Sequence, residues 1–222
     1  IEIEWSTGAD AHDRTPSRRP PNIVLIVADD LGWNDLSMNG PNPTAQTPNI
    51  DALASGGLRF TNFHVTPLCS PTRAALMTGR ANHAVGMRSV SNFRTGFPNQ
   101  LGHISPHATT MAEVFREAGY ATLCTGKWHL APIEQCSAAG PFDQWPLARG
   151  FDRFYGFLDG ETDQFHPDLV ADNHMVAPPG GPDDGYHLSA DLVDRALGMI
   201  TDSVSIRPDR PFFLYLPFGA TH

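Results

Sequence analysis

A cysteine stands where a helix is expected to begin. Cys69 lies two residues before Pro71, and residues 74–77 are good helix formers. Proline is tolerated at the first helical position, where its missing N–H leaves no hydrogen bond unmade, so Cys69 is expected at or just before the helix N-terminus. The unpaired N–H groups and the helix dipole favour a negative group there, and Arg73 lies one turn further on the same face. The pattern predicts a nucleophile beside a cation.

Two carboxylates follow the first strongly apolar run of the chain. Residues 23–28 are apolar without alternation, which is typical of a strand buried on both faces of a parallel sheet. Asp29 and Asp30 come directly after this run. Because ligands of open α/β sheets bind at the carboxyl ends of the strands, we expect both carboxylates to face a ligand site.

Two later strand candidates also lead to polar side chains. Residues 120–125 lead to Lys127 and His129, which would point to the same side if the chain stayed extended. Residues 211–216 form the last apolar run and lead to His222. Because the carboxyl ends of parallel strands meet at one edge, we expect all these groups to gather near the two aspartates and the cysteine.

The remaining segments indicate a layered α/β fold. The alternating residues 58–63 are interpreted as a strand that delivers the cysteine loop. Helices are expected at residues 47–55, from Cys69 onward, at 110–118, where Thr110 and Glu113 form a capping box, and at 189–200. This order predicts a mainly parallel sheet sandwiched by helices. The irregular stretches 82–107 and 131–187 are expected to line the site.

The cysteine stretch resembles the signature of the sulfatase family. Cys69, Pro71 and Arg73, followed by two apolar residues and Thr78-Gly79, match it. The sequences Gly-Lys-Trp-His-Leu at 126–130 and Ala-Asp-Asp-Leu-Gly-Trp at 28–33 are similar to those of bacterial arylsulfatases, and the resemblance extends from about Pro21 to His222. It implies an alkaline-phosphatase-like α/β fold and hydrolysis of small-molecule sulfate monoesters.

The resemblance also implies how the reaction centre is made. Cys69 would be oxidised to Cα-formylglycine by a formylglycine-generating maturation enzyme, and the hydrated aldehyde is the family's nucleophile. Asp29, Asp30 and the modified Cys69 would hold a divalent metal, for which Ca²⁺ or Mg²⁺ suits paired carboxylates.

Four further residues receive roles from the same resemblance. Arg73 would touch both the metal-bound nucleophile and the sulfate, or at least hold the hydrated aldehyde, and Lys127 would stabilise charge on a sulfate oxygen. His129 would take the proton from the second hydroxyl, which expels sulfate and regenerates the aldehyde. His222 would contact the sulfate or the leaving group.

Several features of the family pattern come later than the last residue of this sequence. Members of the family continue with a further Asp followed by Asn or Gln, a second Lys and a smaller C-terminal domain. Asp172-Asn173 offers such a pair, but no apolar strand is expected before it, so we interpret it as a decoy. Residues 1–21 are expected to be a polar lead-in, and 22–222 the N-terminal portion of a catalytic domain, incomplete at the C-terminus and not fully active alone.

Composition excludes some classes of partner. The formal net charge of −9 over 222 residues argues against nucleic acid. No apolar run approaches the ~18 residues of a transmembrane segment. Two alternatives remain open beside the sulfatase hypothesis: a phosphonate or phosphate ester hydrolase of the same superfamily, and an inactive fragment in which Cys69 stays a thiol. The sequence assigns no compartment, oligomeric state or particular sulfate ester.

Overall fold

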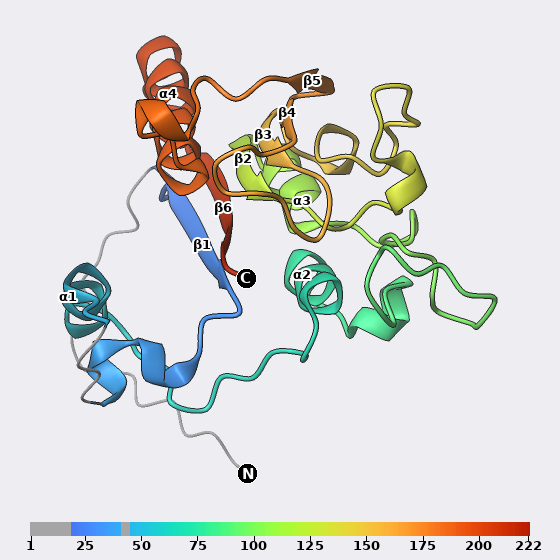
Figure 1. Cartoon of the computed structure of the whole chain (residues 1–222), viewed down its shortest axis with the longest axis horizontal. Helices are drawn as coiled ribbons and strands as arrows, with labels where there is room; N and C mark the ends of the chain where they lie inside the picture. The colour runs from blue at the N-terminus through green and yellow to red at the C-terminus, as the bar shows by residue number, and fades with distance from the viewer. Residues whose placement is uncertain (1–18, 41–44) are drawn as a thin grey trace.

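The computed structural model describes residues 19–40 and 45–222, so residues 1–18 of the expected lead-in lie outside the described residues. Figure 1 shows the helices and strands along the chain. The α-helices are α1 (Pro48–Ser55), α2 (Cys69–Thr78), α3 (Met111–Glu117) and α4 (Leu188–Ile206). The strands are β1 (Ile23–Asp29), β2 (Ala121–Lys127), β3 (Arg153–Phe157), β4 (Leu169–Ala171), β5 (His174–Val176) and β6 (Phe212–Thr221). Short 3₁₀ helices cover Trp33–Asp35, Ser37–Asn39, Asn82–Val85, Ile133–Gln135, Leu147–Arg149 and Pro182–Asp184.

The strands form one sheet in the order β1-β6-β2-β3-β4-β5. The pairs β1–β6, β6–β2 and β2–β3 are parallel, and β4 and β5 are added antiparallel at the far side. The last long strand of the chain, β6, is thus inserted between the first two. This arrangement confirms the predicted mainly parallel α/β fold.

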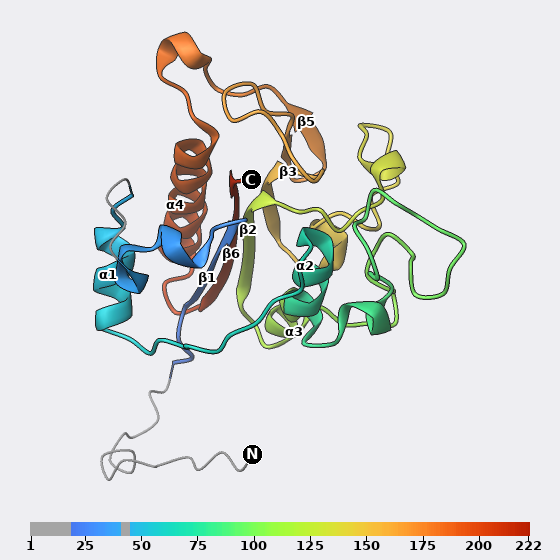
Figure 2. The same cartoon turned by 60° about the horizontal axis from the view of Figure 1, so that its bottom comes forward.

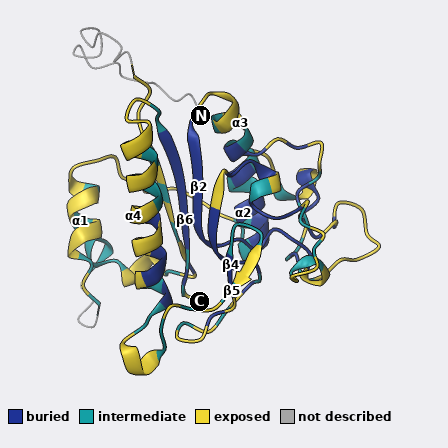
Figure 3. Ribbon diagram, turned by 90° about the horizontal axis from the view of Figure 1, so that it is seen from above, coloured by how far each residue is buried: buried dark blue, intermediate teal, exposed yellow. Residues whose placement is uncertain are grey.

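Helices cover both faces of the sheet, as Figure 2 shows. The long helix α4 packs Leu188, Leu192 and Ala196 against one face. The shorter helices α2 and α3 cover the opposite face and contribute Ala74, Met77 and Ala112 to its core. In Figure 3 the central strands β2 and β6 are buried while the outer side of α4 is exposed. Apolar side chains on alternate positions of the same strands therefore serve two separate cores.

The strand expected at residues 58–63 does not form. This segment carries no strand, and it runs across the surface between α1 and α2 (Figure 1). Leu58, Phe60 and Phe63 are 81, 66 and 71% exposed. Alternation favours a strand only where another strand can pair with its backbone, and in the described residues this segment has no such neighbour.

The strand expected at 211–216 is longer than predicted. β6 continues through Pro217 to Thr221, because its pairing with β1 persists after its pairing with β2 has ended. Pro217 still aligns with Val27, and after a shift in register Thr221 aligns with Asp29. A proline is accommodated where the regular ladder is interrupted. The extension carries the chain to the end of β1.

Asp172 and Asn173 lie at the opposite edge of the sheet. The prediction that no strand precedes them is wrong, since β4 ends at Ala171. The Asp172 carboxylate accepts a hydrogen bond from the backbone N–H of Phe154, near the start of β3, and pairs with Arg153. The interpretation of this pair as a decoy agrees with that position.

In residues 19–40 and 45–222 we find no helix with the length and apolar character that a membrane-spanning segment requires.

Candidate active site

Three neighbouring parallel strands end beside one another. Asp29 is the last residue of β1, Lys127 is the last residue of β2, and His222 follows β6, which lies between them. Figure 2 shows the end of the chain at this edge of the sheet. The Lys127 ammonium donates to the Asp29 carboxylate and lies 3.2 Å from His222 Nδ1. His222 Nδ1 is in turn 3.7 Å from Asp29 Oδ2, so the three groups form one cluster.

Arg73 reaches this cluster from a helix on the sheet's face. The strand that was expected to deliver the cysteine loop does not form, and α2 itself inserts the Arg73 side chain, which is only 2% exposed. Its guanidinium donates to Asp29 Oδ2 at 3.2 Å, to the Lys127 carbonyl at 2.8 Å and to the Tyr215 hydroxyl at 3.4 Å. One side chain therefore ties α2 to β1, β2 and β6.

Cys69 is the first residue of α2, with Leu68 as the N-cap residue. Pro71 is consequently the third helical residue rather than the first, a position at which its missing N–H is equally harmless. Cys69 is half-buried and is not in a disulfide. It lines a cavity of about 530 Å³ together with Asp29, Asp30, Thr72 and Arg73. The structure thus brings the thiol to the same hollow as the carboxylates.

The charges of this site favour an ionised Asp29. Burial acts to raise the pKa of this carboxyl group, but the hydrogen bond from Lys127 and the charge of Arg73 hold the pKa below its usual value. Asp29 therefore stays a carboxylate at neutral pH, and the buried cations have a permanent partner.

Asp29, Asp30 and His222 could hold a metal ion. Each offers one ligand atom, and these atoms all lie within 4.8 Å of one another. Two carboxylates fit Ca²⁺ or Mg²⁺, which prefer oxygen ligands. A hard cation takes about six or more ligands, so this set would supply a part of the coordination sphere. Asp30 has a φ of 59°, a left-handed conformation that a non-glycine residue adopts only where the surroundings enforce it.

His129 is buried close to the cluster but has its own partner. The chain does not stay extended after Lys127, because His129 has a φ of 53°. The expectation that the two side chains share a face by strand alternation therefore fails. His129 Nε2 lies 2.6 Å from Asn92 Oδ1, and no hydrogen bond joins His129 to the other predicted site residues in the part of the chain that is described. Burial, then the charges of Lys127 and Arg73, lowers the pKa of His129 to about 3.

The chain matches the Sulfatase family over residues 21–222. It is 38% identical over 228 residues to arylsulfatase A of Homo sapiens, an alignment that covers 92% of this chain and 42% of that protein. The chain is a member of the sulfatase family. This sulfatase chain spans less than half of the length of arylsulfatase A.

Solved structures agree with the family assignment. The crystal structure of Ps i-CgsB in complex with k-i-k-neocarrahexaose matches the sulfatase chain with a TM-score of 0.74 and 32% identity, covering 91% of this chain and 45% of that one. The phosphonate monoester hydrolase of Agrobacterium radiobacter has a TM-score of 0.55 at 23% identity over 90% of this chain and 40% of that one, a likeness that shows the fold alone.

Several residues that contact the candidate site were not predicted from the sequence. Asn92 lies in the loop that was expected to line the site, but nothing in its spacing distinguishes it from other polar loop residues. Tyr215 belongs to an apolar run, and its hydroxyl contact with Arg73 depends on the packing of α2. The Thr221 hydroxyl donates to the backbone carbonyl of Asp30 at 3.2 Å, which joins the ends of β6 and β1.

Proposed function

We propose that this chain forms the sulfate-binding and nucleophile-bearing part of a sulfuric ester hydrolase. The observation that carries the proposal is the meeting of Asp29, Arg73, Lys127 and His222 beside the cavity lined by Cys69. A doubly negative transition state would be stabilised here by the two buried cations, Lys127 and Arg73, and by His222, which lie beside the cavity that Cys69 lines. Membership of the sulfatase family supports a sulfate ester as the substrate.

The nucleophile would be a modified Cys69. Converted to formylglycine, Cys69 would supply a hydrated aldehyde, which offers one hydroxyl for attack on sulfur and a second whose deprotonation releases the sulfate. The helix N-terminus favours negative charge on that oxygen, and Arg73 on the same cavity wall would orient it. A serine at this position would carry a single hydroxyl, so a sulfated serine would have no second hydroxyl whose deprotonation could release the sulfate.

Asp29 and Asp30 would hold the divalent cation together with the modified Cys69. Their carboxylates suit Ca²⁺ or Mg²⁺, and when bound the metal would polarise the sulfate and favour the ionised form of the nucleophile. Lys127 would then donate to a sulfate oxygen, since its ammonium already lies among the acceptors of this cluster. His222 would contact the sulfate or the leaving-group oxygen rather than the cation, because Ca²⁺ and Mg²⁺ prefer oxygen ligands to an imidazole nitrogen.

His129 would act as the general base on the second hydroxyl. With a pKa lowered to about 3, its imidazole is neutral at physiological pH and has a nitrogen lone pair available. The family role that the sequence resemblance implies for this histidine is therefore compatible with its protonation state.

The experiment that tests the nucleophile is the mass of the peptide containing Cys69. The protein is co-expressed with a formylglycine-generating enzyme, reduced, alkylated and digested. We expect the Cys69 peptide to be lighter than the thiol form by about 18 Da, the difference between CH₂–SH and CHO. Cys124 and Cys136, which are also free thiols, serve as internal controls and should be found alkylated.

Two outcomes would contradict the proposal. A fully alkylated Cys69 in the presence of the maturation enzyme would favour the alternative of a non-catalytic chain. A converted protein that hydrolyses phosphonate esters faster than sulfate esters would favour the phosphonate or phosphate ester hydrolase instead. Assaying both ester classes on the same preparation, with Cys69→Ala as the inactive reference, separates these possibilities.

A further inference from the structure

His129 is fixed through an amide that is itself fixed by a carboxylate. Its Nε2 atom lies 2.6 Å from Asn92 Oδ1, and Asn92 Nδ2 donates to Asp159 Oδ1 at 2.7 Å. The backbone N–H of Gly160 also donates to Asp159 Oδ1, at 2.5 Å. The chain Asp159–Asn92–His129 therefore joins the loop after β3, the loop after α2 and the segment after β2.

The directions of these hydrogen bonds follow from the groups themselves. A carboxylate only accepts, so the NH₂ end of Asn92 must face Asp159 and its carbonyl oxygen must face His129. A carbonyl oxygen also only accepts, so His129 Nε2 must carry a proton. A neutral imidazole has a single N–H, which leaves Nδ1 as the bare nitrogen. Nδ1 is buried and has no hydrogen-bond partner among the described residues.

We propose that Asn92 is a positioning residue that fixes His129 in the Nε2–H tautomer and leaves Nδ1 as the proton-accepting atom. The proposal rests on the proposed function for the source of the proton, but the tautomer follows from the contacts alone. Asn92 does not touch the reacting atoms in this scheme. It acts by deciding which nitrogen of the base is bare.

The loop that carries Asn92 is fastened to the helix that carries Cys69. The backbone N–H of Ser91 donates to Ser70 Oγ at 3.1 Å, and Ser70 follows Cys69 in α2. The amide of Gln100 donates to the carbonyls of Val90 and Phe93, at 3.1 and 2.5 Å, and so holds the loop on both sides of Asn92.

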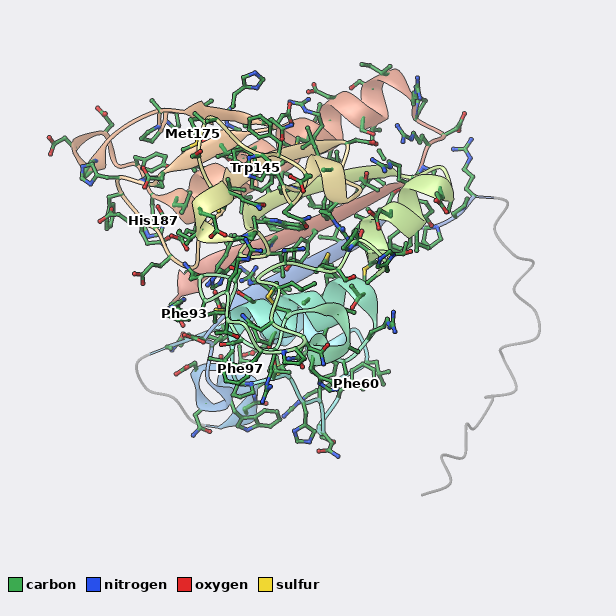
Figure 4. All side chains as sticks on the ribbon, turned by 90° about the vertical axis from the view of Figure 1, so that its right-hand side faces the viewer. Phe60, Phe93, Phe97, Trp145, Met175 and His187 are labelled. Carbon is green, nitrogen blue, oxygen red and sulfur yellow. The ribbon has the colours of Figure 1, made fainter. Side chains whose placement is uncertain are left out.

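The ring of His129 is confined from a second side. In Figure 4 Phe93 and Phe97 mark the Asn92 loop where it passes in front of α2. A Cβ atom at Gly160 would approach His129 Cε1 to 2.8 Å, so the backbone lies directly against the imidazole. The base, its amide partner and the nucleophile-bearing helix therefore form one connected unit.

The tautomer is measured directly by nitrogen NMR on the ¹⁵N-histidine-labelled protein at pH 7.5. The His129 signals are assigned as those missing from His129→Gln. We expect a protonated Nε2 and a bare Nδ1 in the wild-type protein. In Asn92→Leu, which keeps the side-chain volume but offers no acceptor, we expect this single tautomer to be replaced by a mixture. Thr95→Ala, an exposed change in the same loop, should keep the wild-type signals.

The outcomes separate this inference from the proposed function. A bare Nε2 in the wild type, or an unchanged tautomer in a folded Asn92→Leu protein, would overturn the role of Asn92 whatever the activity. Asp159→Asn is a second test, because it removes the carboxylate that orients the Asn92 amide. We expect this variant also to show a mixture of the two His129 tautomers. On sulfate esters we expect Asn92→Leu to lower kcat about 10- to 100-fold with little change in KM. A Cys69 that stays a thiol beside the maturation enzyme would contradict the proposed function and leave the tautomer result standing.

Discussion

Lys127 combines two properties that are rarely found together. It is the single lysine in the sequence, and its side chain is fully buried. A buried lysine is tolerated only when its charge is paired, and here the ammonium donates to Asp29, which Arg73 also contacts. Lys127 and Arg73 therefore share the Asp29 carboxylate as their ion-pair partner.

This burial predicts that Lys127 resists amine-directed labelling. In the native protein we expect an acylating reagent to leave the ε-amine unmodified, because the side chain has no exposed area and its ammonium is ion-paired. In urea the same residue should be labelled completely. Peptide mass spectrometry of the two samples checks this. Rapid labelling of the native ε-amine would show that the cluster opens readily and that Lys127 is not held as described.

Arg73 is the residue through which the helix and the sheet share the site. A lysine could not replace it, because a single ammonium lacks the planar fork that reaches a carboxylate, a carbonyl and a phenol hydroxyl at once. The same contacts hold α2 in place, so the position of Cys69 depends on the arginine as well.

At the scale of elements, helix ends and close strand contacts set where the site residues lie. The Thr110 hydroxyl accepts the N–H of Glu113 at 3.1 Å, and the Glu113 carboxylate accepts the N–H of Thr110 at 2.6 Å, as the capping-box pattern predicted. The Thr110 hydroxyl also donates to the carbonyl of Arg149, which ties the start of α3 to a distant loop.

We therefore expect Thr110→Ala to destabilise the protein by about 1–2 kcal/mol, since a helix cap and a buried hydrogen bond are lost together. Urea unfolding followed by circular dichroism measures the change. Thr109→Ala, an exposed neighbour, is the matched control and should differ from wild type by less than about 0.5 kcal/mol. Equal stabilities of the two variants would show that the cap contributes nothing.

Gly126 allows β2 and β6 to approach closely just before Lys127. It has a φ of 137°, and a Cβ atom there would lie 1.9 Å from the carbonyl oxygen of Pro217. The absence of a side chain thus lets the end of β2 pass beside the bent part of β6. Without this approach Lys127 and His222 would not lie within hydrogen-bond distance.

At the scale of the whole molecule, burial of a neutral histidine makes stability depend on pH. His129 has a pKa lowered to about 3 in the folded protein, by burial first and by Lys127 and Arg73 next, against about 6.5 when unfolded. Between these values the unfolded chain binds a proton that the folded chain does not. The contribution of His129 to stability is therefore complete above about pH 6.5 and falls as the pH drops towards 3.

Between pH 7.5 and pH 5.0 we expect the wild type to lose about 2 kcal/mol more stability than His129→Gln, since each pH unit below 6.5 corresponds to at most about 1.4 kcal/mol. Urea unfolding at the two pH values gives the difference. His174→Gln removes an exposed histidine and should keep the wild-type dependence. If the stability of His129→Gln depended on pH as strongly as that of the wild type, His129 would not be the source of this pH dependence.

The sequence by itself determined the local elements and the edge at which the polar groups gather. The apolar run before Asp29 and the run before Lys127 both form strands. β2 is buried throughout, but the prediction that residues 23–28 are buried on both faces is wrong, because β1 lies at the edge of the sheet and leaves Val24 and Ile26 50 and 56% exposed. The capping box marks the start of α3 from local residues alone. Parallel strands bring their carboxyl ends to one edge, so the neighbourhood of these residues followed from their positions in the chain. The prediction of a strand at residues 58–63 is wrong, because alternation of apolar and polar residues does not by itself provide a partner strand.

Only the tertiary structure decided the contacts within that neighbourhood. The insertion of β6 between β1 and β2 places His222 beside Asp29, and no local pattern encodes the order of strands in a sheet. The left-handed conformation of His129 and its hydrogen bond to Asn92 depend on groups that are 37 residues apart. Local sequence patterns report short-range preferences of the backbone, whereas the orientation of a buried side chain is set by whatever packs against it from distant parts of the chain.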